Sequence, residues 1–501
     1  MTYENGEVIA DYSESPCSLS MRSAKTPKGG IFAEVVNIDE REAGEWMRDK
    51  LLLTSRSASQ AKADALKFGA KGILSDFFPM YKSIRETRAE MTGVSRWDVE
   101  FMPDRNDTAF FAFSLAPERA DTLRNRLAAG ESIRLHAQVD AELFDGNVAT
   151  ISGAILGTEK EKGEIFLYGH LYEPGANDNA SGCALLLECM NIYAQMIKDG
   201  EAERPKRTIR LALGQECMGS NAYLLAHPER KGNMCIVADM VGTEKIDNAT
   251  FGVWHSPFSN WSFLDDLIED TVKKAKKYGD FPHRSRPYGI ATDNMLGDPC
   301  FQMPTIALIT EPAKSYHSSM DTPDRLEEDV IRRNAWIVLE MIQKLSSASD
   351  ENNLESEHTY TKNMFKNART ELEKAFWDQK IKAMQAEKNA FLQGESWKAN
   401  ACDFALPEPP EGVLPIVVTR LKDGCMTLDK VDPETGRVFE TAWNTHLHRP
   451  LYWSDGKKTI WEIACLCAME EGKDDYESTY EEIFSLFRAL SESGTVRLAI
   501  K

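Results

Sequence analysis

Four apolar runs of the sequence each lead to a residue that can bind or activate a metal ion. The first three runs end at His170, Glu216 and Asp239, and the fourth precedes His317 by a few residues. Continuous apolar runs are typical of parallel strands buried on both faces, and the carboxyl ends of such strands open into one crevice. We therefore expect these four side chains to lie close together.

A fifth residue of this kind, Asp178, stands just before a helix-like apolar stretch at 183–197, so its carboxylate is expected at the positive end of that helix. Imidazole and carboxylate groups are the ligands of catalytic zinc, whereas structural zinc sites are rich in thiolates. A bridging carboxylate can hold two ions, and the pair then activates water and polarises a carbonyl. The five residues predict a hydrolase.

The composition excludes several other classes. The chain has 501 residues, with 59 basic and 79 acidic side chains and a net charge of -20. This balance argues against nucleic acid and against an anionic membrane surface as partners. The first residues show no basic-then-apolar signal segment, and we found no run of about 18 apolar residues, so we expect a cytoplasmic protein.

The alternation of patterns along the chain predicts several domains. Residues 1–30 are expected to belong to the catalytic domain, 31–146 to form a small α/β insertion or lid, and 147–350 to form the catalytic domain itself. A long amphipathic helix at 363–393 and a Pro-rich linker are expected within 351–410. The strand at 147–156 is expected to join the larger sheet.

The last segment, 411–501, reads as strand, helix, helix and a terminal β-pair, an order that suits a winged helix. It contains sixteen acidic and eleven basic residues. A winged helix that reads DNA needs a basic face, so contact with another protein, or dimerisation into a homo-oligomer, is the expected role.

Four motifs now point to a known family. GHLYEPGANDNASG, QECMGS, IVADMVG and YHSSMDTPD occur in that order between residues 169 and 324. Residues 147–345 resemble the co-catalytic zinc aminopeptidase family, which includes leucyl aminopeptidases, glutamate carboxypeptidases and glutaminyl cyclases. The stretch ALKFGAKGILSD resembles the protease-associated domain. The order of insertion, peptidase and winged helix resembles bacterial aminopeptidase-like proteins.

The resemblance implies an α/β fold with a three-layer mixed β-sheet zinc-peptidase domain, a small α/β insertion and a C-terminal winged-helix-like domain. It also implies that His170 and Asp239 bind one zinc ion, that Asp178 bridges, and that His317 binds a second ion. One or two zinc ions per chain are expected.

The sequence departs from the family at two points. Where the family has a glutamate base followed by a glutamate ligand, this chain has Gln215-Glu216-Cys217. We assign Glu216 as the general base, because an amide at that position cannot take a proton. Cys217 then either binds zinc as a thiolate or lies in an apolar environment. The family's aspartate two residues after the first histidine is replaced by Tyr172, so Glu173 is the candidate to hold the His170 ring.

Three further residues are candidates for contact with the substrate. Tyr316 either donates to the oxyanion of a tetrahedral intermediate or packs in the core. Arg284 and Arg286 either bind a substrate carboxylate or belong to a solvated loop. His255 is expected to be structural.

These observations predict a zinc-dependent aminopeptidase that acts on short peptides. Two alternatives stay open. The first is another amide hydrolase on the same scaffold, such as an N-acyl amino acid deacylase or a glutaminyl cyclase-like enzyme, since fold and metal site do not fix the bond that is broken. The second is a non-catalytic regulator with a degenerate peptidase domain.

Overall fold

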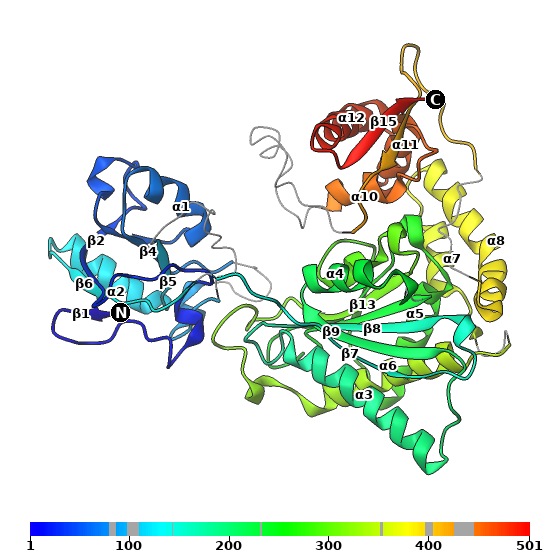
Figure 1. The fold of residues 1–501 in the computed structure, drawn as a ribbon, viewed down its shortest axis with the longest axis horizontal. Helices are drawn as coiled ribbons and strands as arrows, with labels where there is room; N and C mark the ends of the chain where they lie inside the picture. Colours follow the sequence, from blue (N-terminus) through cyan, green and yellow to red (C-terminus); the bar gives the residue numbers. More distant parts are fainter. Residues whose placement is uncertain are drawn as a thin grey trace.

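The computed structural model describes residues 1–79, 87–97, 110–142, 144–230, 233–350, 354–395, 404–424 and 445–501. Figure 1 shows three parts: an N-terminal domain in blue and cyan, a central domain mostly in green, and a C-terminal domain in orange and red. Two yellow helices run along the side of the central domain towards the C-terminal domain. Part of the linker predicted within 351–410 lies outside the described residues.

The central domain is built on a seven-stranded mixed sheet, and the predicted fold class is confirmed. The middle strands β13, β10, β8 and β9 are parallel, whereas β7 and β11 are antiparallel to their inner neighbours. In sheet order the strands are β12 (His283–Arg286), β11 (Thr250–Trp254), β13 (Thr305–Glu311), β10 (Met234–Asp239), β8 (Glu164–Leu171), β9 (Thr208–Gln215) and β7 (Ile151–Ile155). The expectation that 147–156 joins this sheet is confirmed by β7.

Helices cover both faces of this sheet and make three layers (Figure 1). One face carries α3 (Ala180–Asp199), α5 (Phe263–Ala275) and α6 (Glu328–Ser347), and the other carries α4 (Met218–Ala226). Among the described helices, α3 is long and apolar enough to cross a membrane by length and composition. Leu185, Leu186 and Cys189 of this helix are buried in the core of the central domain, as expected of a core helix.

The N-terminal domain has a six-stranded sheet of its own. Its order is β1 (Thr2–Tyr3), β6 (Arg134–Ala137), β2 (Ile31–Asn37), β3 (Leu51–Thr54), β4 (Gly72–Ser75) and β5 (Phe111–Ser114), with helices α1 (Ala58–Lys67) and α2 (Pro117–Ala128). The assignment of residues 1–30 to the catalytic domain is wrong, because β1 pairs with β6. Ile9 and Ala10 are buried with this sheet.

Two helices rather than one follow the central domain. They are α7 (Thr359–Lys366) and α8 (Glu371–Gln393), where a single helix over 363–393 was expected. The break has a local cause: the Thr370 side chain accepts a hydrogen bond from the backbone N–H of Glu373 and starts a new helix. Phe376 and Trp377 of α8 then pack against both the central and the C-terminal domain.

The C-terminal domain contains β14 (Ile416–Arg420), α10 (Thr445–Trp453), α11 (Ile460–Glu471), α12 (Tyr476–Glu492) and β15 (Val496–Ile500). The two strands pair with each other in antiparallel fashion. The winged-helix assignment stays a prediction, and residues 425–444 of the predicted domain lie outside the described residues.

Candidate metal centre

The predicted metal-binding residues meet at the carboxyl edge of the central sheet. His170 lies near the end of β8, Asp239 ends β10, Glu216 directly follows β9, and His317 lies in the loop after β13. Asp178 lies in the loop between β8 and α3. The structure thus brings together all five residues that the sequence singled out.

Asp178 lies between the two histidines and points one carboxylate oxygen at each. Its Oδ1 is 3.3 Å from His170 Nε2, and its Oδ2 is 3.2 Å from His317 Nε2. Two ligand atoms on one tetrahedral zinc ion, each roughly 2.0–2.2 Å from the metal, stand roughly 3.3 Å apart. The two distances therefore fit a carboxylate that bridges two metal positions.

His170, Glu216 and Asp239 form a second cluster around the same imidazole. One ligand atom from each lies within 4.8 Å of the others. Glu216 is close enough to this group to act on a water molecule at the metal position or to contact the metal directly. The buried Oδ1 of Asp239 has no hydrogen-bond partner among the described residues.

Backbone contacts fix the position of Asp178. The carboxylate of Asp321 accepts hydrogen bonds from the backbone N–H groups of Asn177 and Asp178, at 2.7 and 2.9 Å. Gly175 makes room for this arrangement, since a Cβ there would lie 2.2 Å from Asp321 Oδ2. Asp321 belongs to the YHSSMDTPD motif, but its role could not be predicted from that motif.

A residue that the sequence analysis missed lies on the far side of the His170 ring. Asp293 Oδ2 is 3.5 Å from His170 Nδ1. Asp293 Oδ1 accepts hydrogen bonds from the backbone N–H of Cys217 and from Ser220 Oγ. Asp293 is therefore placed to orient the His170 ring, in the manner of carboxylates behind metal-binding histidines.

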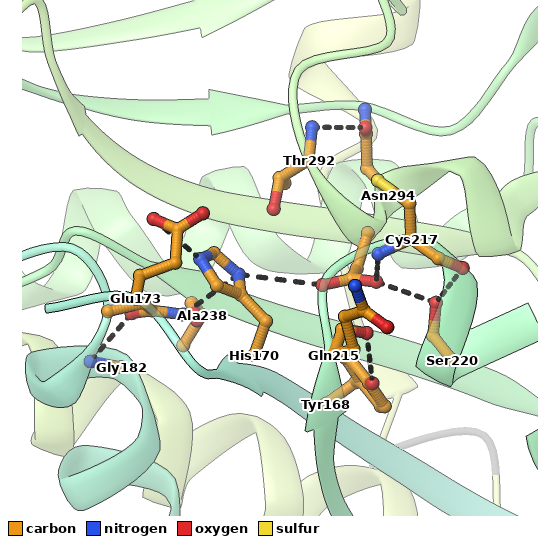
Figure 2. A network of polar contacts seen from close by, with 12 residues as sticks. Tyr168, His170, Glu173, Gly182, Gln215, Cys217, Ser220, Ala238, Thr292 and Asn294 are labelled. Atoms are coloured by element: carbon orange, nitrogen blue, oxygen red, sulfur yellow. Dashed lines mark hydrogen bonds and ion pairs between the residues drawn. The ribbon is translucent and has the colours of Figure 1, made fainter. Parts of the chain in front are cut away.

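Glu173 was expected to orient that ring, and this expectation is wrong. Its Oε2 lies 3.6 Å from Nε2 of His170, which is the nitrogen that faces the metal position, and 3.9 Å from Nε2 of His317. Figure 2 shows Glu173 beside the ring of His170, on the side away from Cys217. Glu173 thus belongs with the metal-facing groups.

Cys217 does not join the metal-facing groups. Its side chain is buried in an apolar cluster with Tyr288, Ile290, Met295 and Tyr452. The chain turns directly after Glu216, where Cys217 has a φ of 57°, and this turn carries the Cys217 side chain into the apolar cluster. Figure 2 shows Cys217 near Asn294 and Ser220, away from His170. The thiolate-ligand alternative is therefore wrong, and the apolar alternative holds.

The three substrate-contact candidates lie in different places. Tyr316 lines the cavity at the site, and its ring stacks on His317 with 3.8 Å between centroids. Arg284 is exposed on β12, and Arg286 pairs with Glu311 at 2.9 Å. Neither arginine is among the described residues that line the cavity, and a part for them in substrate binding stays a prediction.

Burial and like charge raise the pKa of several carboxyl groups. Burial is the largest cause in each, and neighbouring carboxylates add to it, so that the pKa values of Asp239, Glu216 and Glu173 are raised although His170 opposes the shift. For Asp178, burial is outweighed by hydrogen bonds from His170 and His317, which lower its pKa. Bound cations would offset so much buried negative charge.

Backbone strain is concentrated at the same place. Tyr172, Cys217, Met240 and His317 have positive φ values of 76°, 57°, 48° and 50°. Tyr172, Cys217 and Met240 are each adjacent in sequence to a metal-facing residue, and His317 is itself metal-facing. Left-handed backbone at a residue other than glycine costs about 1–2 kcal/mol, and such strain clusters at functional sites.

The site opens into a cavity of about 540 Å³ between the central and N-terminal domains. Its acidic wall contains Glu173, Asp178, Glu216, Asp239 and Glu311. Its other described lining residues are Met240, Ala291, Ile309, Pro312, Ala313, Tyr316 and His317 from the central domain, and Ser57, Ser59, Gln60, Phe77, Pro79 and Arg96 from the N-terminal domain. A cavity of this size holds a small ligand.

Residues 153–342 match the family model described as peptidase family M28. The central domain belongs to this family. The match covers all five residues that meet at the site and the Asp293 and Asp321 that hold them. The M28 domain is that of a metallopeptidase, a hydrolase of the co-catalytic zinc peptidase class.

Solved structures with a similar chain trace include a zinc aminopeptidase from Bacillus subtilis, with 16% identity, a TM-score of 0.49, and coverage of 68% of this chain and 81% of that one. A candidate peptidase from Clostridium acetobutylicum has 14% identity and a TM-score of 0.47, with coverage of 99% and 82%. An M28 peptidase precursor from Shewanella amazonensis has 16% identity and a TM-score of 0.48, with coverage of 64% and 75%. A comparison with curated proteins gave no match.

The residues present in the M28 domain fit zinc. Two imidazoles and several carboxylates are ligands that zinc accepts. The distance from an Asp178 oxygen to Nε2 of each histidine is that of two ligand atoms bound to the same zinc ion. Oδ1 of Asp239, which is buried and has no hydrogen-bond partner among the described residues, can serve as a further zinc ligand.

Proposed function

We propose that this protein is a zinc aminopeptidase that removes N-terminal residues from short peptides. The observation that carries the proposal is the position of Asp178, which points one oxygen at each of two histidines inside a cavity of about 540 Å³. Zinc in such a site polarises a carbonyl group and lowers the pKa of water. The cavity suits a short peptide better than a folded protein.

The ligands divide into two sets. His170, Asp239 and Asp178 would hold one ion, and Asp178, His317 and Glu173 would hold the other. Glu173 thus takes the place that the family gives to a second glutamate after β9, where this chain has Cys217. Support comes from the 3.9 Å separation of Glu173 Oε2 and His317 Nε2.

Glu216 acts as the general base. It would take a proton from the attacking water and deliver it to the leaving amine, since it lines the cavity and lies beside His170 and Asp239. Tyr316 also lines the cavity and would donate its hydroxyl proton as a hydrogen bond to the developing oxyanion. Met240 and Ile309 form an apolar wall that favours an apolar first residue in the substrate.

The Glu216→Gln variant tests the role of this base. We expect it to lose turnover of a leucyl peptide by about 10²–10⁴-fold, the range for general base catalysis, while its zinc content stays normal. Glu188→Gln is a matched control, because Glu188 is exposed on α3. Full activity of Glu216→Gln would overturn the assignment, and loss of zinc would show that Glu216 is a ligand.

An N-acyl amino acid deacylase is the second candidate. Four of the five carboxylates on the acidic wall are assigned to zinc or to the base, which leaves Glu311 to attract a free ammonium group on the substrate, so the aminopeptidase is preferred. Acetyl-leucine and leucyl peptides assayed side by side distinguish the two activities.

A further inference from the structure

The turn that carries Glu216 is covered by the C-terminal domain. Cys217, the residue after Glu216, lies in a buried apolar cluster whose members come from two domains. Among them, Tyr288 belongs to the central domain and Tyr452 belongs to α10 of the C-terminal domain. The hydroxyl oxygens of these two tyrosines lie 2.9 Å apart, so the two domains also share a hydrogen bond at this place.

The backbone of this turn is strained and is held by hydrogen bonds. Cys217 has a φ of 57°, a conformation that is unfavourable for a residue other than glycine. Its N–H donates to Asp293 Oδ1 at 2.8 Å, and its carbonyl oxygen accepts a hydrogen bond from Asn221 Nδ2 at 2.7 Å. Strained backbone persists where the surrounding structure fixes it. The cluster and these hydrogen bonds therefore set the direction of the neighbouring Glu216 side chain.

A second segment of the C-terminal domain supports the same turn through α4. Gly424 lies against this helix, since a Cβ there would be 3.0 Å from Asn221 Oδ1 and 3.2 Å from Leu225 Cδ1. Asn221 is also the residue that donates to the Cys217 carbonyl oxygen. The C-terminal domain thus contacts the surroundings of Cys217 at two places, at Tyr452 and at Gly424.

The position of Glu216 is sensitive to these contacts. Glu216 lines the cavity, whereas Cys217 lies in the cluster behind it. Because adjacent residues share a planar peptide unit, a shift of Cys217 also moves Glu216. A general base must lie within hydrogen-bond reach of the water that it deprotonates, and a misplacement of about 1 Å can reduce a rate by about 10²-fold.

We propose that Tyr452 is a positioning residue for the general base, so that the C-terminal domain completes the catalytic site. This inference rests on the proposed role of Glu216. Tyr452 is not among the described residues that line the cavity. It acts through its packing in the cluster with Cys217 and through its hydrogen bond with Tyr288.

The variant Tyr452→Ala tests the packing. We expect kcat for leucyl-leucine to fall by about 10- to 100-fold, the cost of a base misplaced by up to about 1 Å. The KM and the zinc content should stay unchanged, because the substitution acts on the base and not on the zinc ligands or on substrate binding. A rise in KM with an unchanged kcat would overturn the positioning role.

The hydroxyl pair allows a test by rescue. Tyr452→Phe and Tyr288→Phe each leave one buried hydroxyl without its partner, so each should lower kcat, although less than Tyr452→Ala does. The double variant has no unpaired hydroxyl at this place, and its kcat should be higher than that of either single variant. A double variant in which the two losses simply multiply would contradict the pairing.

Leu490→Ala is the matched control for stability. Leu490 of α12 is fully buried in the C-terminal domain, in a different cluster from Tyr452. The variant should lower the melting temperature without a change in kcat at a temperature where the protein is folded. If Leu490→Ala lowers kcat as much as Tyr452→Ala does, the effect is one of domain stability alone and the proposal is wrong.

The outcomes separate this inference from the proposed function. If wild-type protein hydrolyses leucyl-leucine and Tyr452→Ala keeps its kcat, the positioning role is wrong and the aminopeptidase stands. If zinc-loaded wild type hydrolyses no peptide, the proposed function is wrong. Labelling of the buried Cys217 thiol with iodoacetamide then tests the contact without any activity. The label should enter Tyr452→Ala faster than wild type, and equal rates would overturn the inference.

Discussion

Asp178 is the residue on which the metal centre depends most, because it faces both histidines. A neutral amide in its place would supply one oxygen instead of two and remove a negative charge between two cations. The Asp178→Asn variant should therefore lose most of its zinc together with its activity. Measurement of zinc by mass spectrometry after gel filtration checks this, and a normal zinc content would count against the bridging role.

Glu173 allows a finer test, since it is assigned to one ion of the pair. In Glu173→Gln we expect about one zinc ion per chain to remain where the wild type holds about two, because His170, Asp178 and Asp239 are unchanged. Titration with zinc under buffered conditions gives the stoichiometry. Two tightly bound ions in the variant would exclude Glu173 as a ligand.

Much of the site could be predicted from the sequence, because His170, Glu216, Asp239 and His317 each follow a recognisable apolar run. Asp293 could not, since it lies in a short 3-10 helix at Asp293–Gly297 that no such run precedes. The choice between the two environments of Cys217 could not be made from the sequence, because it depends on the turn of the backbone after Glu216, where Cys217 has a φ of 57°.

At the scale of elements, a buried ionic network joins β11 to α5. His255, at the end of β11, lies 3.1 Å from Asp265 and 2.9 Å from Glu269, both on α5, and is completely buried. Burial opposes the charged imidazole, but the hydrogen bonds that it donates to these two carboxylates outweigh burial and raise the pKa of His255 to about 9. For Glu269, burial is likewise outweighed by His255 and His283, which lower the pKa to about 2.

These pKa values predict how stability depends on pH. The raised pKa of His255 stabilises the folded state fully below its unfolded value of 6.5, and this contribution is lost as the pH rises through about 9. The lowered pKa of Glu269 contributes stability that is complete above pH 4.5, and this contribution is lost as the pH falls through about 2. Both contributions are complete between these limits, so the network stabilises most at about pH 5–6.

The variant His255→Gln tests this linkage. It should lower the free energy of unfolding by about 3 kcal/mol more at about pH 6 than at about pH 10, since the His255 pKa is shifted by about two to three units. Denaturant titrations of wild type and variant at both pH values give the difference. An equal loss at both would contradict a charged His255. The sequence predicted a structural role for His255, and its burial agrees with that role.

The inner strands of the central sheet, β8, β9, β10 and β13, were predictable because both of their faces are buried and their sequences are therefore largely apolar. The break between α7 and α8 was missed because the apolar spacing continues across it, while the capping Thr370 interrupts the backbone hydrogen bonds. The spacing of apolar residues shows which face of a helix is buried. It does not show where one helix ends and the next begins when both bury the same face.

At the scale of the whole molecule, the C-terminal domain is attached to the loop that orients the metal centre. Nη1 of Arg420 on β14 lies 2.7 and 2.8 Å from the two carboxylate oxygens of Asp298. Asp298 is buried, and 10% of the Arg420 side chain is exposed. Tyr452 of α10 forms a 2.9 Å hydrogen bond with Tyr288. These contacts bracket Asp293, which lies behind His170.

Removal of one partner from the Arg420–Asp298 pair should be costly, because it leaves a buried charge without compensation. We expect Arg420→Met to destabilise the protein by about 3–5 kcal/mol, and Arg420→Met combined with Asp298→Asn to cost less than the first change alone. Thermal unfolding measures both. An unchanged melting temperature in Arg420→Met would show that the domain is held elsewhere.

The arrangement of domains was harder to predict than the domains themselves. The first strand pairs with β6, which is more than a hundred residues away, and a two-residue strand has no periodicity to detect. The position of Arg96 beside His317 likewise depends on a contact between segments far apart in the sequence.

The most direct test of the central claim is mass spectrometry of a mixed peptide library incubated with the purified protein, with and without a zinc chelator. The account predicts stepwise loss of N-terminal residues, fastest for short peptides with an apolar first residue, and no loss when the chelator is present. Peptides that remain intact with zinc-loaded protein, or that are shortened equally in the presence of chelator, would contradict it.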